Sequence, residues 1–263
     1  KWIASSDNHK PGSWGGLTGG EALIYRRRTG TTTLWNAVTG KPRWQAPVEG
    51  RNAQHLVFSP DGTQLAEGYH TFVSAVTRVT DGEIVRHFPE IWWVNDIVYS
   101  APANRVVACG LWTQAIRPGA RLFEAATLVP IGEILPHDQE VYCAAFTPDG
   151  HLFATGGRDR LARVFDSATS ETVLAGLAHA APVTRLEFSA DGSQLAVGCE
   201  NGDVRVWDPR TGVPISPWLP HDSTVLRLRF DARGERLLTV TRDGVRTWDL
   251  RTGAVPRHVF PET

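Results

Sequence analysis

Blocks of sequence that recur at a nearly constant interval constrain this chain more than any other feature. A turn block led by an aromatic residue reads FSPDG at 58–62, FTPDG at 146–150 and FSADG at 188–192, with weaker copies at Tyr99 and Phe230. The leading aromatic residues lie 41, 47, 42 and 42 residues apart. Because a fixed period of this length is typical of folds built from repeats, the repeated unit decides the architecture.

A second block follows each of these five turn blocks, and one further copy of it, at Trp35, precedes the first of them. It reads VRVWDPRTG at 204–212 and VRTWDLRTG at 245–253, and it is looser elsewhere. The positions that align with its aromatic residue are Trp35, Thr77, Phe123, Phe165, Trp207 and Trp248. The chain therefore contains six copies of one unit.

Each copy is expected to form four short strands, and the fifth copy shows them most clearly. Its expected strands are 182–188, 194–199, 203–208 and 213–219. The Asn201-Gly202 pair between the second and third strands is typical of a tight hairpin, because both central residues of such a turn need positive φ. Short strands at regular spacing indicate an all-β fold. The matching fourth strand of copy six is expected at 255–260.

A four-stranded unit whose third strand ends in Trp-Asp resembles the repeat of the WD40 β-propeller family. The resemblance covers about residues 20–263 and is strongest in copies four to six. It implies an all-β propeller of four-stranded antiparallel blades, with six blades visible. Three arrangements stay open: a closed six-bladed ring, a seven-bladed ring lacking one blade, and part of a tandem propeller. The absence of methionine favours a fragment of a longer protein.

The resemblance also implies how the chain is divided. We expect residues 1–263 to form a single propeller domain. Its blades are expected at roughly 1–50, 51–90, 91–136, 137–178, 179–220 and 221–263.

Members of the family carry a hydrogen-bonded group of four side chains in a blade: a His before the first strand, a Ser or Thr in the second, an Asp in the next turn and a Trp in the third. In copy six the matching residues are His221, Thr241, Asp243 and Trp248. In copy five they are His179, Cys199, Asn201 and Trp207, where cysteine and asparagine depart from the pattern. In copy four they are His137, Asp159 and Phe165, and Gly157 stands where the hydroxyl is expected.

These repeated polar residues are expected to hold blades together. His137, His179 and His221 occupy the same place in different blades, so they cannot converge on one metal ion. The sequence contains no GxSxG, HExxH or Walker motif, and no GxGxxG before a helix. We therefore expect no catalytic residue, no metal site and no cofactor.

The amino-acid composition disfavours some classes of binding partner. The formal net charge is −1, which disfavours a nucleic-acid binder, because such proteins carry a basic excess. No apolar stretch approaches the roughly 20 residues of a membrane helix. The three cysteines, Cys109, Cys143 and Cys199, are far apart and form no CxxC pair. Buried, reduced cysteines in a cytoplasmic protein are the expectation.

Positions at which the copies differ are the candidates for binding. The resemblance places partners on the top face of the disc, formed by the turns between second and third strands and by the entries to the first strands. The candidate contact residues there are Arg28, His70, Trp92, Trp93, Asn95, Trp112, Tyr142, Arg158, Glu200 and Arg242. An insertion at 111–120 is expected to lengthen a hairpin on the same face.

Two features of these candidates suggest what binds. Arg28, Arg158 and Arg242 favour an acidic or phosphorylated peptide, although ordinary solvated arginines are the alternative. Neighbouring residues of a strand point to opposite faces, so either Trp92 or Trp93 is a candidate anchor for a partner. Burial of both tryptophans between blades is the alternative.

The sequence therefore favours a non-catalytic scaffold or adaptor that presents its top face to a protein or peptide. The alternative is a ligand-sensing module of a larger signalling protein, such as a kinase or a nucleotide-switch ATPase, whose other domains would then be partners. A propeller enzyme is the least favoured function, and polar residues converging in the central channel would be its signature.

Overall fold

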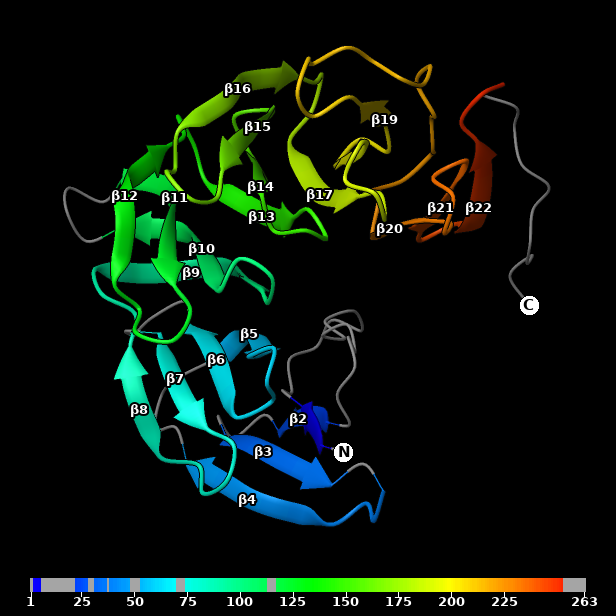
Figure 1. Ribbon diagram of the computed structural model, residues 1–263. Helices are drawn as coiled ribbons and strands as arrows, with labels where there is room; N and C mark the ends of the chain where they lie inside the picture. Colours follow the sequence, from blue (N-terminus) through cyan, green and yellow to red (C-terminus); the bar gives the residue numbers. More distant parts are fainter. Residues whose placement is uncertain are drawn as a thin grey trace.

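The computed structural model describes residues 2–5, 22–27, 31–36, 38–47, 53–69, 74–112 and 117–252. Regular secondary structure within these residues is β-strand, and the strands form six sheets. Figure 1 shows the sheets following one another along an arc, with β22 and the N-terminal sheet at its two ends. The chain is thus all-β, with six sheets arranged as the blades of a propeller, as the repeats predict.

The first three sheets have four strands each. Sheet one contains β1 (Trp2–Ser5), β2 (Ala22–Arg27), β3 (Thr31–Asn36) and β4 (Pro42–Pro47). Sheet two contains β5 (Ala53–Phe58), β6 (Gln64–Tyr69), β7 (Ala75–Arg78) and β8 (Ile84–His87). Sheet three contains β9 (Ile91–Ser100), β10 (Arg105–Trp112), β11 (Arg117–Glu124) and β12 (Pro130–Pro136). All pairings are antiparallel except that of β1 with β2.

Sheets four to six continue the series. Sheet four contains β13 (Val141–Phe146), β14 (Leu152–Gly157), β15 (Leu161–Asp166) and β16 (Thr172–Ala178). Sheet five contains β17 (Val183–Phe188), β18 (Leu195–Cys199) and β19 (Val204–Trp207). Sheet six contains β20 (Arg227–Phe230), β21 (Arg236–Thr241) and β22 (Gly244–Asp249).

The segment 213–219 does not form the regular fourth strand expected for sheet five. It reaches β19 through isolated bridges at Pro214 and Leu219. Pro214 and Pro217 have no N–H to donate, so a continuous ladder cannot form along this segment. The strand expected at 255–260 lies outside the described residues.

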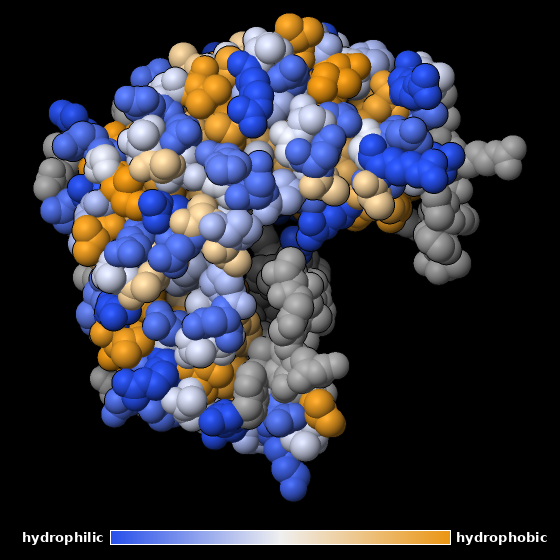
Figure 2. Space-filling model, viewed as in Figure 1, coloured by the Kyte–Doolittle hydropathy of each residue, from blue (hydrophilic) through white to orange (hydrophobic). Residues whose placement is uncertain are grey.

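The first strands of sheets two to six line the inner side of the arc. Contacts join β5 to β9, β9 to β13, β13 to β17 and β17 to β20. Sheets that radiate from a common axis meet most closely at their innermost strands, which explains this order. Figure 2 shows the hollow that the inner strands border. We call this surface the inner wall.

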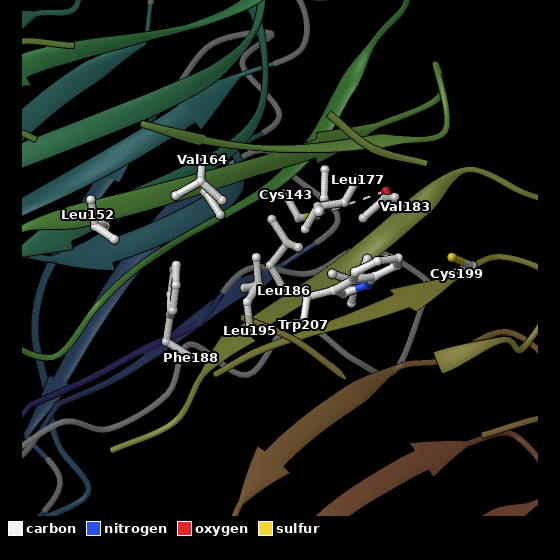
Figure 3. Close-up of a cluster of buried hydrophobic side chains, with 13 residues drawn as sticks. Cys143, Leu152, Val164, Leu177, Val183, Leu186, Phe188, Leu195, Cys199 and Trp207 are labelled. Atoms are coloured by element: carbon white, nitrogen blue, oxygen red, sulfur yellow. Dashed lines mark hydrogen bonds between the residues drawn. The ribbon is translucent and has the colours of Figure 1, made fainter. Parts of the chain in front are cut away.

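The hydrophobic core lies between consecutive sheets. Figure 3 shows the cluster between sheets four and five, which contains Leu152 and Val164 of sheet four and Leu195 and Trp207 of sheet five. Similar clusters join sheets two and three, three and four, and five and six. Burying each such aliphatic side chain contributes about 1.5–3 kcal/mol, so the packing of neighbours stabilises every sheet.

The Asp-Gly pairs are turns, as the sequence predicts. Gly62, Gly150 and Gly192 have φ of 69°, 75° and 71°, a region that glycine enters without strain. Thr147 Oγ1 donates to Asp149 Oδ1 at 2.6 Å, which closes one of these turns. These turns lie at the opposite face from the turns that join second to third strands, because successive strands are antiparallel. We keep the name top face for the latter side.

All three cysteines are buried and unbridged, as expected. Burial raises the pKa of the Cys199 thiol to about 12. In the part of the chain that the structure describes, no helix has the length and apolar character to cross a membrane.

Candidate functional site

In sheet four, His137 precedes the first strand and contacts two neighbouring side chains. Its Nε2 lies 2.8 Å from Thr155 Oγ1, and its Nδ1 lies 3.1 Å from Asp159 Oδ2. Although burial opposes it, hydrogen bonds from His137 and Arg163 lower the pKa of Asp159, so this carboxylate is charged at neutral pH. Thr155 supplies the hydroxyl, and the expectation that Gly157 leaves it missing is wrong.

Sheet six repeats this arrangement around His221. The Nε2 of His221 lies 2.7 Å from Thr239 Oγ1, and Trp248 Nε1 donates to the same hydroxyl at 3.1 Å. Thr241, which the sequence alignment places here, accepts instead from the Asp243 N–H within its own turn at 3.3 Å. Asp243 is exposed in that turn. The hydroxyl of this group is therefore that of Thr239, and the assignment of Thr241 is wrong.

Sheet five keeps the histidine and the tryptophan. Trp207 Nε1 donates to His179 Nε2 at 3.3 Å. Val197 stands at the position that threonine holds in sheets four and six, and Cys199 is buried further along the strand. Asn201 is exposed in the following turn. Burial lowers the pKa of His179 to about 4, so the imidazole is neutral and its Nε2 can accept this hydrogen bond.

Removing the hydroxyl of Thr239 should destabilise the chain more than removing that of Thr241. Thr239→Val removes the hydroxyl that the buried His221 and Trp248 nitrogens share and leaves them only their own contact of 3.2 Å, which costs about 1–3 kcal/mol. Thr241→Val is the matched control, because it removes a weaker bond on the same strand. Urea unfolding at neutral pH measures both variants. A larger loss of unfolding free energy for Thr241→Val than for Thr239→Val would support the sequence-based assignment of Thr241 to this group.

Several candidate contact residues are exposed on the top face. Trp93 is 37% exposed, and the side chain of Arg158 is 58% exposed. Glu200 and Arg242 are also exposed. Three other candidates are not described at side-chain level: Arg28 and His70, which lie outside the described residues, and Trp92, which is described only by its place in β9.

A pocket of about 280 Å³ opens between sheets three and four on the top face. It is lined by Leu111, Pro118, Gln139, Glu140 and Arg158, and we call it the hairpin pocket. Trp93 is the cross-strand partner of Leu111. Paired residues of antiparallel strands project to the same side of the sheet. The exposed Trp93 ring therefore lies on the side of sheet three that borders the pocket.

Hydrogen bonds fix the tryptophan and join the two sheets beside the pocket. Trp93 Nε1 donates to Asn95 Oδ1 at 2.8 Å. Asn95 Nδ2 donates in turn to the carbonyl oxygen of Val141 at 2.9 Å. This chain of contacts runs from β9 to the start of β13, so sheets three and four are held in register at the pocket.

The charged groups of the hairpin pocket are only loosely paired. Arg158 Nη1 lies 3.9 Å from Glu140 Oε2, and Tyr142 O–H donates to the same oxygen at 3.4 Å. Burial and the Glu140 charge raise the pKa of Tyr142, which keeps its hydroxyl protonated as a donor. Exposed ion pairs at such distances contribute about 0–1 kcal/mol. An incoming carboxylate or phosphate can therefore compete with Glu140 for the Arg158 guanidinium.

Trp112 does not join this surface, which corrects the expectation that it is a partner anchor. The insertion lengthens the hairpin as expected, because β10 and β11 pair as far as Trp112 and Arg117. Trp112 is 0% exposed and packs against Phe123, with ring centroids 6.0 Å apart. Its neighbour Leu111 points to the pocket, and alternation along β10 turns Trp112 into the core.

Polar residues also gather on the inner wall. His55 Nδ1 lies 3.7 Å from Asp96 Oδ1, and their side chains remain 32% and 22% exposed although protein atoms crowd around them. This crowding lowers the pKa of His55 to about 4 and raises that of Asp96 to about 6. Burial also raises the pKa of the Cys143 thiol, so it stays protonated at neutral pH. Cys143 is therefore not an activated thiol.

Comparison with known proteins supplies a family and distant relatives. Residues 123–263 match a β-propeller family described as nucleolar protein 10-like, N-terminal domain. Over 168 residues, the chain is 24% identical to eukaryotic translation initiation factor 3 subunit I of Bombyx mori, covering 60% of this chain and 50% of that protein. The Danio rerio protein of the same name is 26% identical over 155 residues, covering 56% and 47%. The chain spans about half the length of these curated relatives.

Proposed function

Because this chain belongs to the family of nucleolar protein 10-like N-terminal propeller domains, we propose that it is a protein-interaction scaffold. The two curated relatives are named as subunits of a translation initiation factor. A subunit acts within a larger assembly, which supports a binding role for a related propeller. The cytoplasmic location expected from the sequence stays a prediction.

The observation that carries the proposal is the exposed Trp93 beside the hairpin pocket. Tryptophan is among the residues that contribute most to binding at protein interfaces, because it buries a large apolar ring. A ring that is 37% exposed and held by Asn95 loses little conformational freedom when a partner covers it. The neighbouring pocket is large enough to accept one side chain of the partner.

We propose that the partner is an acidic or phosphorylated peptide segment. Its apolar side chain would cover Trp93 and enter the pocket between Leu111 and Pro118. Its carboxylate or phosphate would replace Glu140 beside Arg158, a geometry that arginine binds through two parallel hydrogen bonds. Arg242 lies on a turn of another blade and would serve only a longer partner.

An array of acidic, phosphorylated and unmodified peptides tests this function. The wild-type chain should bind a subset of acidic or phosphorylated peptides. Trp93→Ala should weaken that binding by about 2 kcal/mol or more, which is about 30-fold. Arg158→Glu should abolish the preference for negative charge, because two carboxylates would then face the peptide.

Arg210→Glu is the matched control, since Arg210 is an exposed arginine in a turn on the opposite face. Thermal unfolding of all variants shows whether the fold is retained. Peptide binding that is equal in wild type and Trp93→Ala would contradict the proposed site. Equal loss in Arg210→Glu would attribute the binding to overall charge and not to the hairpin pocket.

A further inference from the structure

Five residues occupy one repeat position on the strands that form the inner wall. They are His55, Asp96, Cys143, Arg185 and Arg227, which lie on β5, β9, β13, β17 and β20. Each lies on the first strand of its sheet, and these strands contact one another in sequence. The position therefore carries a neutral or acidic residue in sheets two to four and an arginine in sheets five and six.

A third arginine lies beside these two. Arg229 follows Arg227 by two residues on β20, so both side chains project to the same side of the strand. Arg227 is exposed, and the Arg229 side chain is 65% exposed. Arg229 Nη1 donates to Glu187 Oε1 at 2.6 Å, which orients its guanidinium toward β17. The arginine cluster, defined as Arg185, Arg227 and Arg229, thus spans two neighbouring sheets.

Arg185 is fixed in place by backbone carbonyl groups. Its Nε donates to the oxygen of Leu226 at 2.7 Å, and its Nη1 donates to the oxygen of Thr184 at 2.5 Å. The first bond crosses from β17 to the residue that precedes Arg227. The guanidinium of Arg185 is therefore held next to β20, close to the other two arginines, before any ligand arrives.

The three like charges affect one another. Burial, together with the charges of Arg185 and Arg229, lowers the pKa of Arg227. Arg185 also contributes to the lowered pKa of His55 on the far side of the inner wall. Positive charges gathered on one surface raise the local electrostatic potential and attract an anion more strongly than a single charge does.

We propose that the arginine cluster on the inner wall binds a compact phosphorylated small molecule. The planar guanidinium group presents paired N–H donors that match the oxygens of a phosphate. Figure 2 shows strongly hydrophilic side chains bordering the hollow beneath the sheets at the top of the view, where sheets five and six lie in Figure 1. This site is separate from the hairpin pocket, so it goes beyond the proposed scaffold function.

Neighbouring acidic groups favour a compact ligand over a long polyanion. Glu187 lies on one side of the cluster, and Asp96 is close enough for Arg185 to favour its ionised form. These carboxylates would repel phosphates that extend beyond the arginines. The chain's net charge of −1 likewise provides no general attraction for nucleic acid.

Calorimetric titration with pyrophosphate, in a buffer of low ionic strength, tests the proposal. The wild-type chain should show saturable binding at one site. Arg227→Gln and Arg229→Gln should each weaken binding by about tenfold or more, because each removes a charge-assisted hydrogen bond. The double variant should show no saturable binding. Arg210→Gln, on an exposed turn remote from the inner wall, should bind as the wild type does.

The same titration with a phosphopeptide and with a single-stranded RNA oligonucleotide distinguishes the ligand class. Tighter binding of either macromolecule than of pyrophosphate, lost in the double variant, would overturn the small-molecule assignment. Absence of saturable pyrophosphate binding, or equal binding by wild type and the double variant, would overturn the site itself. Circular dichroism and thermal unfolding confirm that each variant is folded, and the two single variants provide independent tests.

Discussion

Gly110→Ala is expected to destabilise the folded chain by about 3 kcal/mol and to remove peptide binding at the hairpin pocket. A Cβ atom at this position would lie 1.7 Å from the carbonyl oxygen of Trp93 and 2.8 Å from its carbonyl carbon. The obstacle is backbone, so no side-chain rotation relieves it. Gly110 also borders an irregularity in the pairing of β10 with β9. Strand β9 must therefore shift, which displaces Trp93.

Gly176→Ala is the matched control for this variant. Its added Cβ would lie 3.3 Å from Leu161 Cδ2, the flexible end of a side chain. This variant should change the free energy of unfolding by less than about 1 kcal/mol. Urea unfolding measures both variants, and the peptide array measures their binding. If Gly110→Ala and Gly176→Ala had the same free energy of unfolding, β9 and β10 would not approach each other as closely as described.

Acidification is expected to produce the second large effect, a loss of stability as the pH falls from about 6.5 to about 4. Burial lowers the pKa values of His55 and His179 to about 4, and those of His137 and His221 are lowered as well, also chiefly by burial. A base whose pKa is depressed by folding is protonated more readily in the unfolded chain. Stability is then full above pH 6.5 and declines below it.

His179 alone accounts for about 2 kcal/mol of this loss at pH 5, given the difference between pKa values of about 6.5 and about 4. Protonation would also break the hydrogen bond that Trp207 donates to its Nε2. Asp96 acts in the opposite direction, because burial raises its pKa to about 6 and folding therefore favours its protonated form. Burial also raises the pKa of Glu187, and these two carboxyl groups offset only part of the effect of four histidines.

Urea unfolding between pH 7.5 and pH 4.5 measures this dependence. The wild-type chain should lose stability throughout the acidic half of this range, and His179→Gln should show a smaller loss. A pH-independent free energy of unfolding, or equal slopes for wild type and variant, would contradict the account of buried neutral histidines.

The repeats were enough to predict the architecture. The period of the aromatic-led turn blocks, together with the six aligned copies of the second block, predicts six four-stranded units. The Asp-Gly turns restrict where a strand can end, because they need positive φ. The fourth strand of sheet five could not be predicted from its hydrophobic pattern alone. Pro214 and Pro217 break the ladder there, and their effect outweighs the apolar character of 213–219.

The hydrogen-bond partners within each unit could not be predicted from the sequence, because they depend on how far along its strand each residue lies relative to the histidine. Thr239 and Thr241 lie two residues apart on one strand and share a face, so alternation cannot choose between them. Only the structure shows which hydroxyl is level with His221. Leu111 and Pro118 could have been predicted as pocket residues, because they lie in the insertion at 111–120. No local sequence signal marks Gln139 as a pocket residue. The arginine cluster becomes visible only when the first strands are aligned position by position.

We propose that positions at which the repeats differ, around Trp93 and the hairpin pocket, form the binding face. Hydrogen exchange of the chain, measured with and without its tightest-binding peptide, tests this proposed binding face. We expect slowed exchange at residues 91–95 and 139–142, with little change at the Asp-Gly turns of the opposite face. Slowed exchange confined to the turns at 61–62, 149–150 and 191–192 would contradict it.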